Sequence, residues 1–205
     1  MTTLEQFSTL LNPWSPEPAL LQDCYTQLVQ LYTAADRYYH NLTHIAHTLQ
    51  VAAELKPLAN DDTAIQLALW FHDVIYDARA ADNEAQSAAW AQRWLAHFGV
   101  SQPLLTQVEQ LIMVTKTHTP TTIDEQIVVD ADLAILGAEP ERYQQYSHAI
   151  RQEYAWVEPE PYRQGRGRVL QMFLQRPRIF QTPPLYDQLE AQARHNLQAE
   201  LETLT

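Results

Sequence analysis

The stretch AIQLALWFHDVIYD, residues 64–77, joins an apolar run typical of a buried helix to an adjacent histidine–aspartate pair. Neighbouring residues on a helix point about 100° apart, so His72 and Asp73 rarely serve one packing role. From the rim of a helix end, however, an imidazole and a carboxylate can converge on a single ion. Because burying a titratable pair costs free energy unless its charge is compensated, the stretch indicates a bound cation.

Helical periodicity continues outward from this stretch, with apolar residues recurring at steps of three and four. The one ambiguous run, Ile127 to Gly137, begins Ile-Val-Val like a strand, but the chain has no second strand to pair with it. We therefore predict a helix there, and an all-α, single-domain fold of about ten helices over residues 1–205. The proline-rich run 158–161 is expected to separate two helices. The predicted helices cover residues 4–11, 20–32, 42–55, 62–71, 83–98, 102–116, 127–137, 141–157, 166–174 and 186–204.

The composition argues against several kinds of partner and location. The 13 basic and 25 acidic residues give a formal charge of −12, which does not favour nucleic acid or an anionic membrane. Cys24 is the only cysteine, so an internal disulfide is impossible and a reducing compartment is expected. The N-terminus lacks the features of a signal peptide, and no stretch approaches the roughly 20 apolar residues of a membrane span. We expect a cytoplasmic protein with no nucleic-acid or membrane partner; a homo-oligomer is compatible with the sequence but not indicated by it.

Two imidazoles and two carboxylates form the candidate metal site. His44 begins an apolar helical face and should point inward, where an imidazole needs a hydrogen-bond partner or a metal. Asp130 and Asp132 lie in an apolar run without Lys or Arg to pair with them. A simpler interpretation is that one of them faces solvent and the other hydrogen-bonds locally. Together with His72 and Asp73, these residues offer mixed nitrogen and oxygen donors, which suit one divalent ion such as Mn²⁺, Fe²⁺, Co²⁺, Ni²⁺, Zn²⁺ or Mg²⁺.

The order His…His-Asp…Asp on helices resembles the HD superfamily of metal-dependent phosphohydrolases. The resemblance extends beyond these residues to a bacterial group of predicted HD phosphohydrolases, and it spans nearly the whole chain. The motifs that carry it are Tyr39-His40-Asn41-x-x-His44, Trp70-Phe71-His72-Asp73-x-x-Tyr76, Asp82-Asn83-Glu84-x-x-Ser87-Ala88, Asp130-Ala131-Asp132-Leu133-x-x-Leu136-Gly137, Ile150-Arg151-x-Glu153-Tyr154 and Ala193-Arg194-x-Asn196-Leu197.

The resemblance implies an HD-type helical bundle that binds one metal ion through His44, His72, Asp73 and Asp132. It also implies hydrolysis of a phosphate ester or anhydride of a small phosphorylated substrate, such as a nucleotide. The metal-site core would span about residues 37–137, with C-terminal helices at about 140–205 packing on it. Asp130 could replace Asp132 as the last ligand, although we predict Asp132.

Three residues are candidates for a catalytic role, namely Asp73, Glu84 and His118. Glu84 could act as a general base or position a water. It also lies at the expected start of a helix, where a carboxylate commonly stabilises the helix end. His118 follows Lys116 and Thr117 and could reach the site as a substrate contact.

Four residues are candidates for binding the substrate. Arg37 and Lys116 adjoin the motifs, and cations suit the binding of phosphate. A solvated surface charge is an equally good interpretation of each. His40 and Asn41 could contact the substrate or orient His44, as partners of metal-bound histidines often do.

The sequence leaves other functions open. A non-catalytic metal- and nucleotide-binding module would carry the same ligands but hydrolyse nothing. A di-metal HD oxygenase would need further histidines between the His-Asp pair and the last aspartate, where the chain has only His97 and His118. A purely structural helical protein would leave the two aspartates of the apolar run unexplained.

Overall fold

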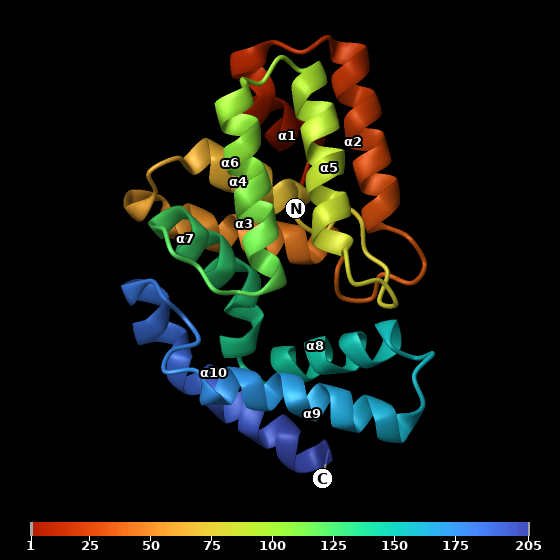
Figure 1. Cartoon of the computed structure of the whole chain (residues 1–205), viewed down its shortest axis with the longest axis vertical. Coiled ribbons are helices and arrows are strands. Elements are labelled where there is room, and N and C mark those ends of the chain that lie inside the picture. Colours follow the sequence, from red (N-terminus) through yellow and green to blue (C-terminus); the bar gives the residue numbers. More distant parts are fainter. Residues whose placement is uncertain (1, 205) are drawn as a thin grey trace.

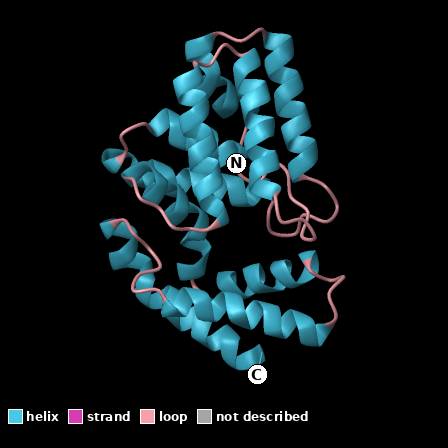
Figure 2. Ribbon diagram, viewed as in Figure 1, coloured by secondary structure: helices cyan, strands magenta, loops and turns pink. Residues whose placement is uncertain are grey.

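The computed structural model describes residues 2–204 and is all helical over that range, as the sequence predicts (Figure 2). Four short 3₁₀ segments connect or extend the ten α-helices of the described residues. None of these helices combines the length and the apolar character needed to cross a membrane. The α-helices are α1 (Leu4–Leu11), α2 (Pro18–Tyr32), α3 (Leu42–Leu55), α4 (Asp62–Phe71), α5 (Asn83–His97), α6 (Gln102–Met113), α7 (Ile123–Leu133), α8 (Pro140–Glu153), α9 (Pro159–Gln175) and α10 (Pro183–Leu204), and the 3₁₀ segments are η1 (Asn12–Trp14), η2 (Lys56–Leu58), η3 (Val114–Lys116) and η4 (Ala134–Gly137).

Helix α4, the apolar run before the His-Asp pair, lies at the centre of the fold. It begins at the N-cap Asp61, whose carboxylate accepts a hydrogen bond from the Ala64 amide at 2.9 Å. The helix packs against α3, α6 and α7, and its residues from Ala64 to Phe71 are buried except Gln66. Trp70 and Phe71 are among the largest fully buried side chains, and the Tyr32 hydroxyl of α2 donates to the Trp70 carbonyl at 3.0 Å. The end of α4 is therefore anchored on several sides.

The C-terminal helices form a second group below the first seven (Figure 1). The chain passes from α7 through the 3₁₀ segment η4 into α8, and α10 packs against both η4 and α9. In Figure 1, α8 and α9 lie beneath the first group of helices, and α10 lies behind α9. This arrangement places the C-terminal ends of α4 and α7 near α8 and α9.

The proline-rich run does not separate two helices as predicted. Helix α8 ends at Glu153, and α9 begins at Pro159, inside the run 158–161. Proline is well tolerated in the first turn of a helix, because the amide that it lacks would have no partner there. The same reason explains why α10 begins at Pro183, three residues before the predicted start.

Gly137 provides a test of the contact between η4 and α10. A Cβ atom at this position would lie 2.9 Å from the carbonyl oxygen of Leu189 and closer still to its Cβ. Because backbone cannot yield as a flexible side chain can, we expect Gly137→Ala to lower the free energy of unfolding by about 2 kcal/mol. Chemical denaturation would measure this change.

Gly165 is the matched control for that substitution. It lies within α9, and a Cβ atom there would meet nothing within 4 Å. Gly165→Ala should therefore raise the free energy of unfolding by about 0.5–1 kcal/mol, as alanine does in a helix. Equal effects of the two substitutions would contradict the close packing of η4 against α10.

Candidate metal centre

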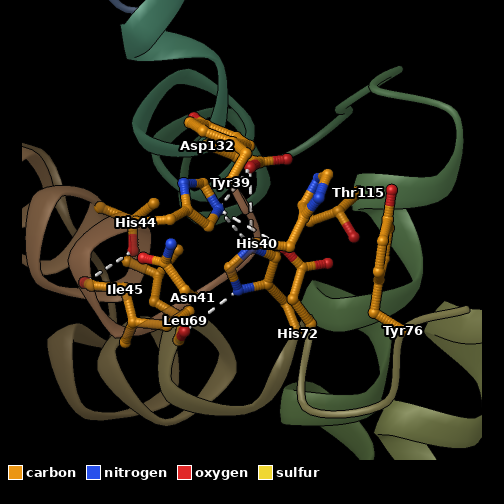
Figure 3. Close-up of polar contacts among 12 residues, drawn as sticks. Tyr39, His40, Asn41, His44, Ile45, Leu69, His72, Tyr76, Thr115 and Asp132 are labelled. Carbon is orange, nitrogen blue, oxygen red and sulfur yellow. Dashed lines mark hydrogen bonds and ion pairs between the residues drawn. The ribbon is translucent and has the colours of Figure 1, made fainter. Parts of the chain in front are cut away.

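Donor atoms from three helices converge at one point (Figure 3). His44 lies in the first turn of α3, His72 follows α4, and Asp132 lies near the end of α7. The Nε2 atoms of His44 and His72 are 3.2 Å apart, and Asp132 Oδ1 lies 3.3 Å and 3.5 Å from them, respectively. The potential ligand atoms of these three residues all lie within 4.8 Å of one another. Asp73 adds a further oxygen, Oδ2, at 3.4 Å from His44 Nε2 and 3.2 Å from His72 Nε2.

These separations suit a divalent ion. For metal–ligand bonds of about 2.1 Å, neighbouring ligands of a tetrahedral or octahedral ion lie about 3.0–3.4 Å apart. The tautomer of His72 is also suitable, because its Nδ1 faces the Leu69 carbonyl at 3.0 Å and donates to it. That hydrogen bond leaves the lone pair on Nε2, the atom in the cluster. The group of His44, His72 and Asp132 could therefore hold a metal ion, with Asp73 as an additional donor.

The charges of the cluster also favour a bound cation. Burial disfavours protonation of His72, but the charge of Asp73 and hydrogen bonding with Asp132 outweigh it and hold its pKa well above the ordinary value. Burial likewise opposes ionisation of Asp132, yet hydrogen bonds from His118, His44 and His72 hold its pKa well below the ordinary value. The carboxylates thus remain ionised and favour positive charge between them. Either protons or a divalent cation can supply that charge, so the two compete.

The turn that presents the His-Asp pair is held by Arg37. Its guanidinium donates to the carbonyls of Asp73 at 2.6 Å, Val74 at 2.8 Å and His40 at 3.0 Å. The side chain is buried and does not line the pocket described below. Contrary to the expectation for a phosphate-binding cation, the guanidinium is occupied by main-chain oxygens, and it positions the turn that carries His72 and Asp73.

Arg37→Lys tests this positioning role. A lysine ammonium cannot reproduce the planar fork that spans three carbonyls, so we expect a loss of about 2 kcal/mol in the free energy of unfolding. Urea denaturation would measure it. Arg93→Lys, on the exposed side of α5, is the control and should change stability by less than about 0.5 kcal/mol. An Arg37→Lys variant with an unchanged free energy of unfolding would contradict this positioning role.

Asp130 does not belong to the cluster. It is fully buried, and its carboxylate accepts hydrogen bonds from the Gln181 amide at 2.9 Å and from the amide and hydroxyl of Thr182 at 2.7 Å each. It thus satisfies main-chain donors just before α10. The alternative in which Asp130 replaces Asp132 as the ligand is excluded by this geometry. Contrary to the simpler interpretation, neither aspartate is a freely solvated surface group.

A cavity of about 540 Å³ opens beside the cluster. Asp73, Asp132, His40, Glu84 and His118 all line it. His118, in a left-handed backbone conformation with φ of 50°, places Nε2 at 3.1 Å from Asp132 Oδ2. The Glu84 carboxylate has no hydrogen-bond or ion-pair partner within residues 2–204. The structure therefore brings the three candidate catalytic residues to one cavity.

Two predicted substrate contacts lie elsewhere. Asn41 caps α3: its Oδ1 accepts from the Thr43 amide at 2.8 Å, and its Nδ2 donates to the Tyr38 carbonyl at 2.9 Å. Lys116 is exposed, and its ammonium donates to the Ala81 carbonyl at 2.9 Å. Neither lines the cavity. The polar atoms of both side chains are used by nearby main chain, so neither residue is placed to bind substrate there.

Glu153 is a buried residue beside the site, and the sequence alone predicts no role for it. Its carboxylate accepts hydrogen bonds from the amides of Tyr39 at 2.7 Å and His40 at 2.9 Å, and from the Tyr76 hydroxyl at 3.2 Å. It also lies 2.7 Å from His40 Nδ1. Because α8 supplies this carboxylate, the C-terminal helices orient His40 at the cavity. In the sequence, Glu153 stands out only as part of the motif Ile150-Arg151-x-Glu153-Tyr154, which does not indicate these hydrogen bonds.

The fold and the site together define an all-helical protein with a candidate histidine–aspartate metal centre beside a cavity. The chain matches no protein-family model, no curated protein and no solved structure. The geometry described above and the pattern of residues in the sequence are therefore the basis for a functional proposal.

Proposed function

We propose that this chain is a metal-dependent phosphohydrolase of the HD type, which cleaves a phosphate ester or anhydride of a small molecule. The observation that carries the proposal is the convergence of two imidazole nitrogens and a carboxylate oxygen, within 4.8 Å of one another, beside an accessible cavity. The order of these residues along the chain, His44, His72-Asp73 and Asp132, supports the same class of enzyme through the resemblance in sequence.

His44, His72 and Asp132 would hold the ion, with Asp73 as a further ligand. The chemistry that a divalent ion supplies when bound is polarisation of a phosphoryl oxygen and a lowered pKa of a coordinated water. His118 hydrogen-bonds the second oxygen of Asp132 and thereby leaves Oδ1 directed at the imidazoles. This chain therefore contributes an oriented set of ligands as well as the cavity beside them.

His40 and Glu84 would act on the substrate rather than on the ion. Glu153 fixes His40 Nδ1, so the remaining ring nitrogen is available to a ligand in the cavity, where His40 stacks against Tyr76 with ring centroids 4.1 Å apart. The unpaired carboxylate of Glu84 can accept a proton from an attacking water. A base without a competing partner in the protein suits that task.

Glu84→Gln tests the role of this carboxylate. We expect kcat to fall by about 100-fold or more, because the amide cannot accept the proton, while metal content stays unchanged. Asp82→Asn, two residues earlier and outside the cavity lining, is the control and should leave kcat unaffected. A Glu84→Gln variant with normal kcat would remove Glu84 from the mechanism and support its role at the start of α5.

The proposed function is tested by phosphate release from the purified protein, as isolated, after chelation and after reconstitution with divalent ions. We expect turnover of at least one phosphate ester or anhydride that is lost on chelation and in the double variant His72→Ala/Asp73→Ala. Metal binding without turnover of any compound would contradict the proposal and favour the non-catalytic binding module.

A further inference from the structure

Two chemically different sets of side chains line the cavity beside the metal centre. The segments after α2, α4 and α6, together with α5 and α7, supply the polar set: His40, Asp73, Glu84, His118 and Asp132. Helices α8 and α9 and the turn between them supply a wall that, apart from Arg166, is mainly apolar or aromatic. Its principal side chains are Ile150, Tyr154, Val157, Tyr162, Val169 and Phe173. A ligand that fills the cavity must therefore meet both a charged centre and a large apolar surface.

Among the described residues, no lysine or arginine that lines the cavity is free to bind a chain of phosphates. Of the lining residues within the described range 2–204, Arg166 is the only lysine or arginine. Its guanidinium is paired with Glu200, at 2.8 Å through Nε and 3.0 Å through Nη2. Its Nη1 donates to the Tyr146 hydroxyl at 3.2 Å. Sites that bind polyphosphate ordinarily supply unpaired Arg or Lys to each phosphoryl group.

The negative charge of the cavity strengthens this argument. Asp73, Glu84 and Asp132 all line it, so with these three carboxylates ionised a single divalent ion would leave a net negative charge. A di- or triphosphate adds several negative charges and would find no further cation to compensate them. A substrate with one phosphoryl group demands the least compensation.

We propose that the substrate is an ester with a single phosphoryl group and a bulky apolar or aromatic alcohol, in preference to a nucleoside di- or triphosphate. This inference rests on the proposed function and assigns its substrate class. The phosphoryl group lies at the metal centre, and the organic group lies against the wall of α8 and α9. Burial of that group, rather than ion pairing, supplies most of the discrimination between substrates.

Val169 offers a way to test the wall without disturbing the metal site. It lies on α9, lines the cavity and is 41% exposed, so a charged residue there should be tolerated by the fold. Met172, one turn further along α9, is 45% exposed and lies outside the cavity lining. Val169→Asp and Met172→Asp thus place the same charge on the same helix, inside and outside the cavity.

The experiment is calorimetric titration of the metal-loaded full chain with 1-naphthylphosphonate, methylphosphonate and ADP, the last as its α,β-methylene analogue. In each of the three, a P–C bond replaces the bond that the enzyme would hydrolyse. For the wild type we expect 1-naphthylphosphonate to bind about tenfold or more tighter than methylphosphonate, and also tighter than ADP. Val169→Asp should reduce the preference for naphthyl over methyl to about threefold or less, whereas Met172→Asp should retain it.

The inference is overturned if naphthyl and methyl phosphonates bind equally, if ADP binds tightest, or if the two variants behave alike. Phosphate release from 1-naphthyl phosphate and ATP by the same protein separates this inference from the proposed function. Turnover that favours ATP would reject the substrate class and keep the phosphohydrolase. Tight naphthylphosphonate binding with no release from any ester would keep the ligand class and reject the hydrolase.

Discussion

Asp132→Asn is expected to weaken divalent-metal binding by more than about 100-fold, which exceeds the loss seen when only the outer partners of a metal ligand are changed. Asp132 supplies the carboxylate oxygen that lies 3.3 Å from His44 Nε2 and 3.5 Å from His72 Nε2. The amide is neutral and a poorer ligand, so both the charge and the donor strength at the centre fall. The asparagine side chain would also replace the carboxylate that faces His118.

The measurement is a titration with Mn²⁺ or Zn²⁺ followed by thermal unfolding. At an ion concentration 100 times its dissociation constant, binding should stabilise the wild type by about 2.7 kcal/mol, and the melting temperature should rise accordingly. Because its dissociation constant would then equal or exceed that concentration, Asp132→Asn should gain no more than about 0.4 kcal/mol. Asp187→Asn, an exposed aspartate on α10, is the control and should respond as the wild type does. An unchanged metal response in Asp132→Asn would exclude Asp132 as a ligand.

Asp130→Ala, two residues away, is expected to act on stability instead of metal binding. The carboxylate is fully buried and satisfies the amides of Gln181 and Thr182 and the Thr182 hydroxyl. Removing it leaves three polar groups in a buried or half-buried setting without their acceptor, and each such group costs about 1–3 kcal/mol. We expect the free energy of unfolding to fall by about 3 kcal/mol or more.

Chemical denaturation of Asp130→Ala beside Thr182→Val would test this role. Thr182→Val removes only the hydroxyl donor and should cost about 1 kcal/mol. The folded fraction of Asp130→Ala should still bind metal as the wild type does, because its carboxylate faces the start of α10. A loss of metal binding without a loss of stability would reverse the roles that we assign to Asp130 and Asp132.

Much of the fold could be predicted because helical periodicity is local information. The spacing of apolar residues predicted α1 and α3 with the bounds that the structure shows. The helix in the run from Ile127 was predicted instead from the lack of a second strand, and in the structure α7 begins four residues earlier, at Ile123. The predicted start of α9, at residue 166, was wrong for a physical reason. Proline can either end a helix or begin one, and the sequence of 158–161 does not distinguish the two cases.

The site could be predicted only in part. His72 and Asp132 were recognisable because titratable residues in apolar runs need compensation. The place of Arg37 could not be predicted, since its acceptors are main-chain carbonyls as far as 37 positions away. Glu153 reaches His40 from a helix 113 positions later, and only the tertiary fold brings them together. Asp130 and Asp132 look alike in sequence, and only the position of α10 distinguishes them.

The most direct test of the metal centre is anomalous X-ray diffraction from crystals of the full chain loaded with Mn²⁺ or Zn²⁺. We predict one strong anomalous peak between the side chains of His44, His72, Asp73 and Asp132, about 2.0–2.2 Å from the two Nε2 atoms and from Asp132 Oδ1. An ion bound elsewhere on the chain, or no peak at these residues after loading with either ion, would contradict the account.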